Sequence, residues 1–211
     1  MKAHTLETQS TVTPSKAIEF LKEGNERFVS NLKMNRNLLE QVNDTREGQW
    51  PFATILSCID SRTSAELIFD QGLGDIFSVR IAGNFINKDI LGSMEFGCGI
   101  AGSKLIVVLG HTECGALKGA LNAEQTHSLE MDNLNGLVDH FAPQIDKILL
   151  PGEEKSSANA DLLDRLTTSN IQQSIIDIRQ NSKTLREMEQ EGKILIVGAN
   201  YCVKSGKVTW I

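Results

Sequence analysis

Short apolar runs alternate with amphipathic segments along this chain of 211 residues. The apolar runs have the length of strands and cover residues 52–57, 76–81, 104–109 and 193–199, and a short last strand is predicted over 207–211. Apolar residues at helical spacing predict helices over 14–28, 90–102, 114–121, much of 134–149, and 161–190. This alternation predicts an α/β fold with a largely parallel central sheet and flanking helices.

The first predicted helix carries a clear start signal. Thr13 is a common N-cap residue, and Pro14 fits the first helical turn because that position needs no backbone donor. Ala17, Leu21 and Phe28 then fall on one face of the helix. The segment is therefore expected to pack against an apolar surface.

The length of the chain predicts a single domain spanning residues 1–211. Within it, residues 1–30 form an N-terminal extension and helix, and residues 52–211 form the α/β core. The formal net charge is −6, without a basic face, so nucleic acid is not expected as a partner. No apolar stretch reaches the roughly 20 residues of a membrane span, so no membrane partner is expected either.

The cysteines and the N-terminal residues bear on the compartment. The first dozen residues lack the apolar segment of a signal peptide, so we expect a cytoplasmic protein. In a reducing compartment the four cysteines are metal ligands, nucleophiles or buried thiols rather than a disulfide framework.

Reactive side chains follow two of the predicted strands. Cys58, Asp60 and Arg62 follow the strand 52–57, whereas His111 and Cys114 follow the strand 104–109. The carboxyl ends of parallel strands are where α/β folds place their sites. Two thiolates and one imidazole form a zinc ligand set with a fourth position left open. Taken alone, each cysteine could instead be a small buried side chain, and the Asp–Arg pair a structural ion pair.

The motifs SCIDSR at 57–62 and GHTECGA at 110–116, with AELIFDQGLGDIFSVRIAGN between them, resemble those of β-class carbonic anhydrases. The resemblance extends from about Ala17 to the C-terminus. It implies an enzyme, a zinc lyase (carbonate dehydratase), whose residues 52–211 form the zinc-binding core. By this resemblance, Cys58, His111 and Cys114 bind one Zn²⁺ per chain.

The resemblance also implies the reaction and the roles of two residues. The expected reaction is the reversible hydration of CO2 to bicarbonate and a proton, by attack of zinc-bound hydroxide. Asp60 and Arg62 would form a catalytic dyad in which Asp60 accepts a hydrogen bond from the hydroxide and Arg62 holds the carboxylate. An alternative is hydrolysis of carbonyl sulfide or carbon disulfide on the same scaffold. A catalytically silent bicarbonate-sensing protein is disfavoured, because both dyad residues and all three ligands are present.

The plant-like branch of this family suggests further substrate contacts. By position these are Gln49, Phe77, Phe96 and Gly115, with Phe96 standing where that branch has a tyrosine. Without the resemblance, Gln49 would be a solvated loop residue and Phe77 a core strand residue. The resemblance further implies a homodimer or a homotetramer built from dimers, with the N-terminal helix packing on a partner subunit.

Overall fold

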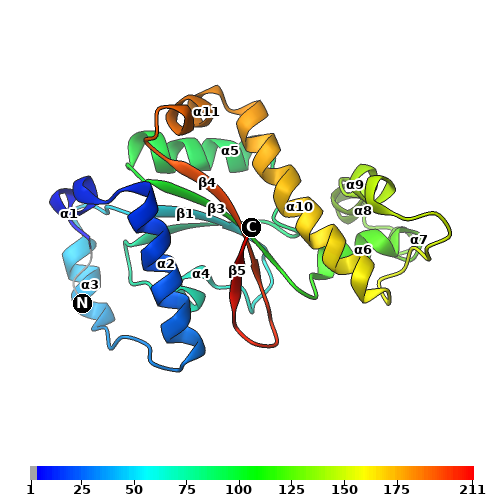
Figure 1. The fold of residues 1–211 in the computed structure, drawn as a ribbon, viewed down its shortest axis with the longest axis horizontal. Helices are drawn as coiled ribbons and strands as arrows, with labels where there is room; N and C mark the ends of the chain where they lie inside the picture. Colours follow the sequence, from blue (N-terminus) through cyan, green and yellow to red (C-terminus); the bar gives the residue numbers. More distant parts are fainter. Residues whose placement is uncertain (1–3) are drawn as a thin grey trace.

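The computed structural model describes residues 4–211, and residues 1–3 of the predicted N-terminal extension lie outside the described residues. A five-stranded sheet forms the centre of the fold, in the order β2-β1-β3-β4-β5 (Figure 1). The strands are β1 (Ala53–Ser57), β2 (Ile76–Arg80), β3 (Leu105–His111), β4 (Leu195–Tyr201) and β5 (Val208–Trp210). All neighbouring pairs are parallel except β4 with β5, which confirms the largely parallel α/β fold.

The two central strands explain the strongest apolar runs of the sequence. Every residue of β1 and of β3 is buried, because each strand has a neighbour on both sides and helices cover both faces of the sheet. A strand covered on both faces has no polar face, so its sequence is continuously apolar rather than alternating.

Helices cover the sheet on both faces and at its carboxyl edge (Figure 1). On one face α2 and α4 cover the sheet, and on the other α5, α10 and α11 cover it. A third apolar cluster joins α6, α8, α9 and the start of α10 beyond the strand ends. The helices are α1 (Leu6–Thr11), α2 (Pro14–Val29), α3 (Leu38–Thr45), α4 (Ala65–Ile68), α5 (Lys88–Glu95), α6 (Gly115–Leu121), α7 (Ala123–His127), α8 (Asp132–Asp139), α9 (Ala142–Ile148), α10 (Ala160–Asn181) and α11 (Lys183–Gln190).

Three predicted helices are interrupted in the structure. The segment 134–149 divides into α8 and α9, with Pro143 in the first turn of α9, where its missing N–H costs nothing. The segment 161–190 divides at Ser182, whose side chain accepts a hydrogen bond from the backbone of Leu185 and so caps α11. The segment 90–102 becomes α5 followed by a π-helical turn over Phe96–Ile100.

The N-terminal helix packs on its own chain. Ala17 and Leu21 of α2 are fully buried against Phe52 and Phe69, in the core cluster on one face of the sheet. The chain's own sheet thus buries this apolar face, and the expectation that the helix packs on a partner subunit stays a prediction. Any contact of α2 with a partner has to use its remaining surface.

A buried ion pair fastens the N-terminal segment 27–36 to the core. Asp70 is 4% exposed and accepts hydrogen bonds from the guanidinium groups of Arg27, at 2.6 Å, and Arg36, and from the backbone N–H of Met34. Burial by itself would raise the pKa of the Asp70 carboxyl, but these hydrogen bonds outweigh it and hold the pKa below its ordinary value. The carboxylate is thus fully matched by charges of the chain itself.

Within residues 4–211, every helix is too short or too polar to cross a lipid bilayer.

Candidate metal centre

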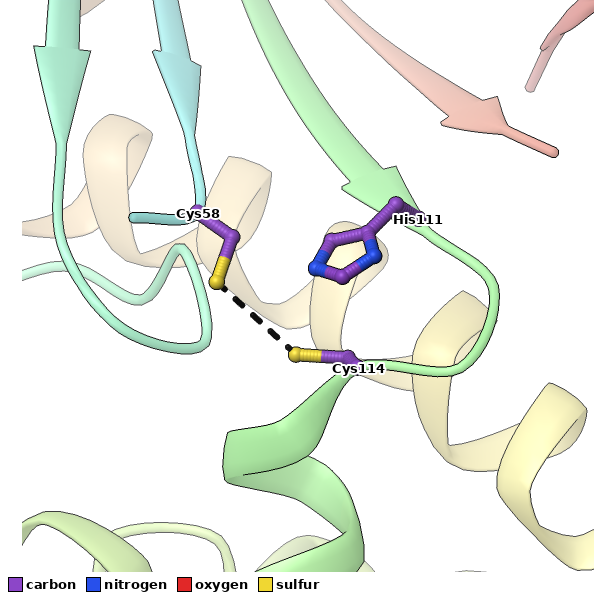
Figure 2. A group of neighbouring side chains, drawn as sticks. All are labelled: Cys58, His111 and Cys114. Carbon is purple, nitrogen blue, oxygen red and sulfur yellow. Dashed lines mark hydrogen bonds between the residues drawn. The ribbon is translucent and has the colours of Figure 1, made fainter. Parts of the chain in front are cut away.

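Three buried side chains meet at the carboxyl edge of the sheet (Figure 2). Cys58 follows β1, His111 ends β3, and Cys114 is the N-cap of α6. Their ligand atoms lie within 4.8 Å of one another, and the two sulfur atoms are 4.0 Å apart. Two thiolates on a tetrahedral zinc, each at about 2.3 Å, would lie about 3.8 Å apart. The cluster therefore has the spacing of a zinc site.

The register of the sheet brings the ligands together. Ser57 of β1 pairs with Leu109 of β3, so Cys58 and His111 leave the sheet at neighbouring positions. Between His111 and Cys114, Glu113 adopts a φ of 60°, in the left-handed region that few residues other than glycine enter. This turn returns the chain so that Cys114 faces the same point as His111.

One ring nitrogen of His111 is ready to bind a metal. The Nδ1 atom lies 2.9 Å from the backbone oxygen of Thr112, and because that oxygen can only accept, Nδ1 carries the proton. The Nε2 atom is then an acceptor, and it is buried without a hydrogen-bond partner within residues 4–211. In Figure 2 the ring nitrogen opposite this bond faces the two cysteines. A buried lone pair without a donor is what a metal ion would satisfy.

The two thiols differ in acidity. Hydrogen bonds from the Cys114 thiol and from the backbone N–H of Gly83 lower the pKa of Cys58. The adjacent Cys58 sulfur and burial raise the pKa of Cys114, although backbone N–H groups at the start of α6 act in the opposite direction. The chain itself thus stabilises one thiolate, and a second one needs a cation between the sulfur atoms.

The loop after β1 is held by backbone contacts that the sequence did not reveal. Arg80 donates from Nε to the backbone oxygen of Cys58 at 2.9 Å and from Nη2 to that of Asp60 at 2.6 Å. The Thr63 hydroxyl lies 3.0 Å from the Cys58 oxygen and 2.8 Å from the Asp60 oxygen. Arg80 stands at the end of the neighbouring strand β2, and that position did not by itself indicate these contacts.

Asp60 and Arg62 form a two-point ion pair beside the cluster. Arg62 donates from Nε to Oδ1 at 2.9 Å and from Nη2 to Oδ2 at 2.7 Å, and its backbone N–H also donates to Oδ1. The hydrogen bonds from Arg62 are the main reason that the pKa of Asp60 is lowered to about 2. Asp60 is therefore an anionic acceptor, held in one orientation at neutral pH.

A cavity of about 400 Å³ opens next to Cys58 and Asp60. Gly115 and Ala116 of α6 line it, and a side chain at Gly115 would meet no atom within 4 Å. The opposite wall is apolar and is made by Leu134, Leu137 and Val138 of α8. Of the four suggested substrate contacts, Gly115 is the one that lies at this cavity.

The other three suggested contacts lie away from this cavity within one chain, and their part in substrate binding stays a prediction. Gln49 lines a separate hollow with Thr45 and Gly74. Phe77 and Phe96 line another hollow beside β2, with their ring centroids 6.2 Å apart. The aromatic pair is real, but it does not face Cys58.

Strand register explains this separation. Phe77 pairs with Thr54, which precedes Cys58 by four residues, or about 13 Å along an extended strand. Phe96 lies on the same level, because the next residue, Gly97, packs on the side chain of Thr54. Gln49 precedes β1 altogether. These residues occupy the amino-terminal half of the sheet, whereas the candidate metal ligands occupy its carboxyl edge.

Comparisons with known proteins agree with the geometry of this site. The family model described as carbonic anhydrase matches residues 53–208. Carbonic anhydrase 2 of Mycobacterium tuberculosis is 35% identical over 195 residues, which cover 92% of this chain and 91% of that protein. The carbonic anhydrase of Mycolicibacterium smegmatis is 33% identical over 196 residues, with 92% of each chain covered.

Solved structures share the whole architecture. The β-carbonic anhydrase CcaA superposes with a TM-score of 0.67 at 25% identity, covering 93% of each chain. A Coccomyxa β-carbonic anhydrase gives the same TM-score at 20% identity and covers 93% of this chain and 82% of its own. With its Cys-His-Cys cluster at the strand ends, the chain belongs to the carbonic anhydrase family, in its β class.

Proposed function

We propose that this chain catalyses the reversible hydration of CO2 to bicarbonate and a proton, with one zinc ion held by Cys58, His111 and Cys114. The observation that carries the proposal is the buried cluster of three ligand atoms within 4.8 Å, in which Nε2 of His111 has no hydrogen-bond partner in the described part of the chain. Thiolate and imidazole donors in this number suit zinc and leave a fourth position free.

Zinc, when bound there, would supply Lewis acidity that lowers the pKa of a water molecule. The role of Asp60 is to accept a hydrogen bond from the attacking water and so to orient it toward the carbon of CO2. Arg62 keeps the carboxylate ionised and fixed, because it contacts both carboxylate oxygens. The backbone contacts of Arg80 and Thr63 hold this loop in place.

The cavity suits an uncharged substrate. CO2 has no net charge and no hydrogen-bond donor, so its transfer from water to an apolar wall has only a small desolvation cost. Leu134, Leu137 and Val138 supply such a wall opposite Asp60 and Cys58. Bicarbonate is charged and would be released from these surroundings toward water.

The direct test is stopped-flow CO2 hydration together with zinc analysis on the purified protein. We expect one zinc per chain and a rate that falls when a chelator removes it and recovers when zinc is returned. Zinc-loaded protein without hydration activity would contradict the proposal. Release of hydrogen sulfide from carbonyl sulfide, without CO2 hydration, would instead identify the alternative activity, hydrolysis of carbonyl sulfide.

We also propose that the working form is a homodimer or homotetramer. In the described chain β2 pairs on one side only, and Phe96 and Ile100 beside it are 54% and 77% exposed. Gln49, Phe77 and Phe96 could contact substrate only if a second copy of the chain brought them to the cavity. A chain from a study of two tetrameric β-carbonic anhydrases of Sordaria macrospora shares the fold at 22% identity, with a TM-score of 0.59.

Light scattering tests the assembly. We expect a mass of at least twice 23.2 kDa at micromolar concentration. Substitution of the exposed ring, Phe96→Asp, should lower that mass, because a charge does not fit an apolar contact. A monomeric wild-type protein with full activity would contradict the proposed oligomeric state. It would leave the proposed metal ligands unaffected.

A further inference from the structure

A tight turn lies against the Cys58 sulfur. The backbone N–H of Asn84 donates to the oxygen of Ile81 at 2.9 Å, which closes a four-residue turn after β2. Gly83, at the third position, has a φ of +78°, whereas Ala82 is not among the residues with positive φ. That combination is a type II turn, which needs glycine at this position. A side chain at Gly83 would also lie 2.5 Å from the ring of Phe141.

The turn directs a backbone donor at one proposed zinc ligand. The N–H of Gly83 donates to Cys58 Sγ at 3.4 Å. Type I and type II turns differ by a flip of the central peptide, so the turn type decides whether this N–H faces the sulfur. A hydrogen bond of this kind disperses the charge of a buried thiolate and orients it.

One side chain of α10 anchors the turn from behind. Asn170, fully buried and 87 residues away in sequence, donates from Nδ2 to the backbone oxygen of Gly83 at 2.8 Å. Its Oδ1 atom is buried without a hydrogen-bond partner among residues 4–211. The amide thus has one unmet oxygen on the buried face of α10, which burial alone would disfavour. The hydrogen bond to the Gly83 oxygen is the contact that explains why an amide is buried at this position.

We infer that Asn170 is a positioning residue for the metal centre: by holding Gly83, it keeps the backbone N–H aimed at Cys58 and so sets the affinity of the site for metal. The inference rests on the proposed role of Cys58 as a zinc ligand. Asn170 does not touch the cluster, and it acts through the Gly83 backbone alone.

Ser174 offers a matched control on the same helix. It lies one turn after Asn170, is 1% exposed, and donates to the backbone oxygen of Asn84 at 3.3 Å. Asn84 belongs to the same turn, but its oxygen is not on the path from Asn170 through Gly83 to Cys58. Loss of either anchor loosens the turn, and only loss of Asn170 removes the support of the sulfur contact.

The experiment compares wild type, Asn170→Leu and Ser174→Ala by zinc competition with a chelator and by cobalt substitution. Asn170→Leu keeps the size of the side chain and removes the donor. We expect its zinc Kd to rise about 10- to 100-fold, the range for residues that support metal ligands. The sulfur-to-cobalt charge-transfer band should move to longer wavelength, because a thiolate that loses a donor holds its electrons less tightly. Ser174→Ala should keep both near their wild-type values.

The outcomes separate this inference from the proposed function. If wild type binds no zinc, the metal assignment itself fails. If wild type binds zinc and a folded Asn170→Leu shows the wild-type Kd and cobalt band, the positioning role is wrong and the metal assignment stands. Equal changes in Asn170→Leu and Ser174→Ala would also overturn it, because they would indicate general loosening of the turn.

Two further measurements cover the case in which Asn170→Leu does not fold. Asn170→Ser, which is shorter and cannot span the distance to Gly83, should show the same shift of the cobalt band. In wild-type protein loaded with ¹¹³Cd, the Gly83 amide proton should show a scalar coupling to the metal through Cys58. Absence of that coupling overturns the inference without any substitution.

Discussion

Two regions of the molecule bury ionisable groups, and they treat the resulting charge in opposite ways. Where the N-terminal segment 27–36 packs on the core, the Asp70 carboxylate forms ion pairs with Arg27 and Arg36. At the carboxyl edge of the sheet, Cys58, Cys114 and His111 bring three electron-pair donors together, with no cationic side chain among them. The first region is electrostatically complete, and the second is complete only with a cation.

This difference separates a structural ion pair from a binding site. Removing one partner of a matched buried pair leaves the other charge unpaired, so such a pair contributes to the stability of the fold. A buried donor set without a matching charge costs stability until a ligand binds. The unmatched cluster therefore marks the candidate functional site, even though both regions are buried and both depend on residues distant in sequence.

The largest effect is expected from breaking the unmatched cluster. Cys114→Ser should lose the bound zinc, because a serine hydroxyl is not deprotonated as a thiol is, and CO2 hydration should fall to the level of zinc-free protein. Metal analysis and stopped-flow kinetics measure both. Cys202→Ser, at a half-buried cysteine outside the cluster, should keep zinc and activity. Full zinc occupancy in Cys114→Ser would remove Cys114 from the ligand set.

The next effect is expected at the ion pair beside the cluster. Asp60→Asn should keep one zinc per chain but lower kcat about 10²- to 10³-fold, as for loss of one preorganised polar group. The physical reason is that an amide is a weaker acceptor than an anion held by Arg62. Zinc content and the CO2 hydration rate should be measured on the same sample. Near-normal rates would make Asp60 a purely structural partner of Arg62.

Breaking the matched pair should affect stability rather than metal binding. Asp70→Asn should lower the free energy of unfolding by about 3 kcal/mol, because it leaves the buried Arg36 guanidinium and the partly buried Arg27 guanidinium without their counter-charge. Urea unfolding gives the value, and the zinc content should stay at one per chain. Asp60→Asn is the matched control for stability, since its partner Arg62 is half exposed and such a pair contributes little. Loss of zinc in a folded Asp70→Asn variant would contradict the prediction that this ion pair contributes to stability and not to metal binding.

The smallest effect is expected in the pH dependence of the contribution that Asp70 makes to the free energy of unfolding. The pKa of Asp70 is lower in the folded chain than its ordinary value of about 3.9, so the pair stabilises the fold fully above that pH. As the pH falls below about 4, the folded state binds a proton less readily than the unfolded chain, and the contribution is lost. The difference in unfolding free energy between wild type and Asp70→Asn should therefore shrink on acidification. A difference that stays constant down to pH 2 would exclude titration of Asp70 as the cause.

The sequence carried enough information to predict the sheet and the cluster of candidate metal ligands, because both depend on where the strands run and end. Buried central strands such as β3 need continuous apolar residues, so they stand out in a linear pattern. The ligands follow two such strands, and parallel pairing brings strand ends to one edge. Helix ends were predicted less well, because a single capping residue such as Ser182 divided a segment with continuous helical spacing.

The substrate contacts and the packing of the first helix could not be predicted in this way. Whether Phe77 faces the site depends on its pairing with Thr54, which is a property of the sheet register and not of the motif. Likewise, an apolar face such as that of α2 indicates burial but not which surface provides it. The chain's own sheet and a partner subunit offer the same chemistry to that face.

By itself, the sequence determined the α/β class, the two strand ends and the chemistry placed there, because element type and terminal residues depend on neighbours in the chain. Tertiary structure alone decided that Asp70 meets Arg27 and Arg36, which precede it by 43 and 34 residues. It also decided that Asn170 reaches Gly83 across 87 residues. Such contacts depend on how the helices pack on the sheet, and packing is set by the shape of the whole core rather than by any local pattern.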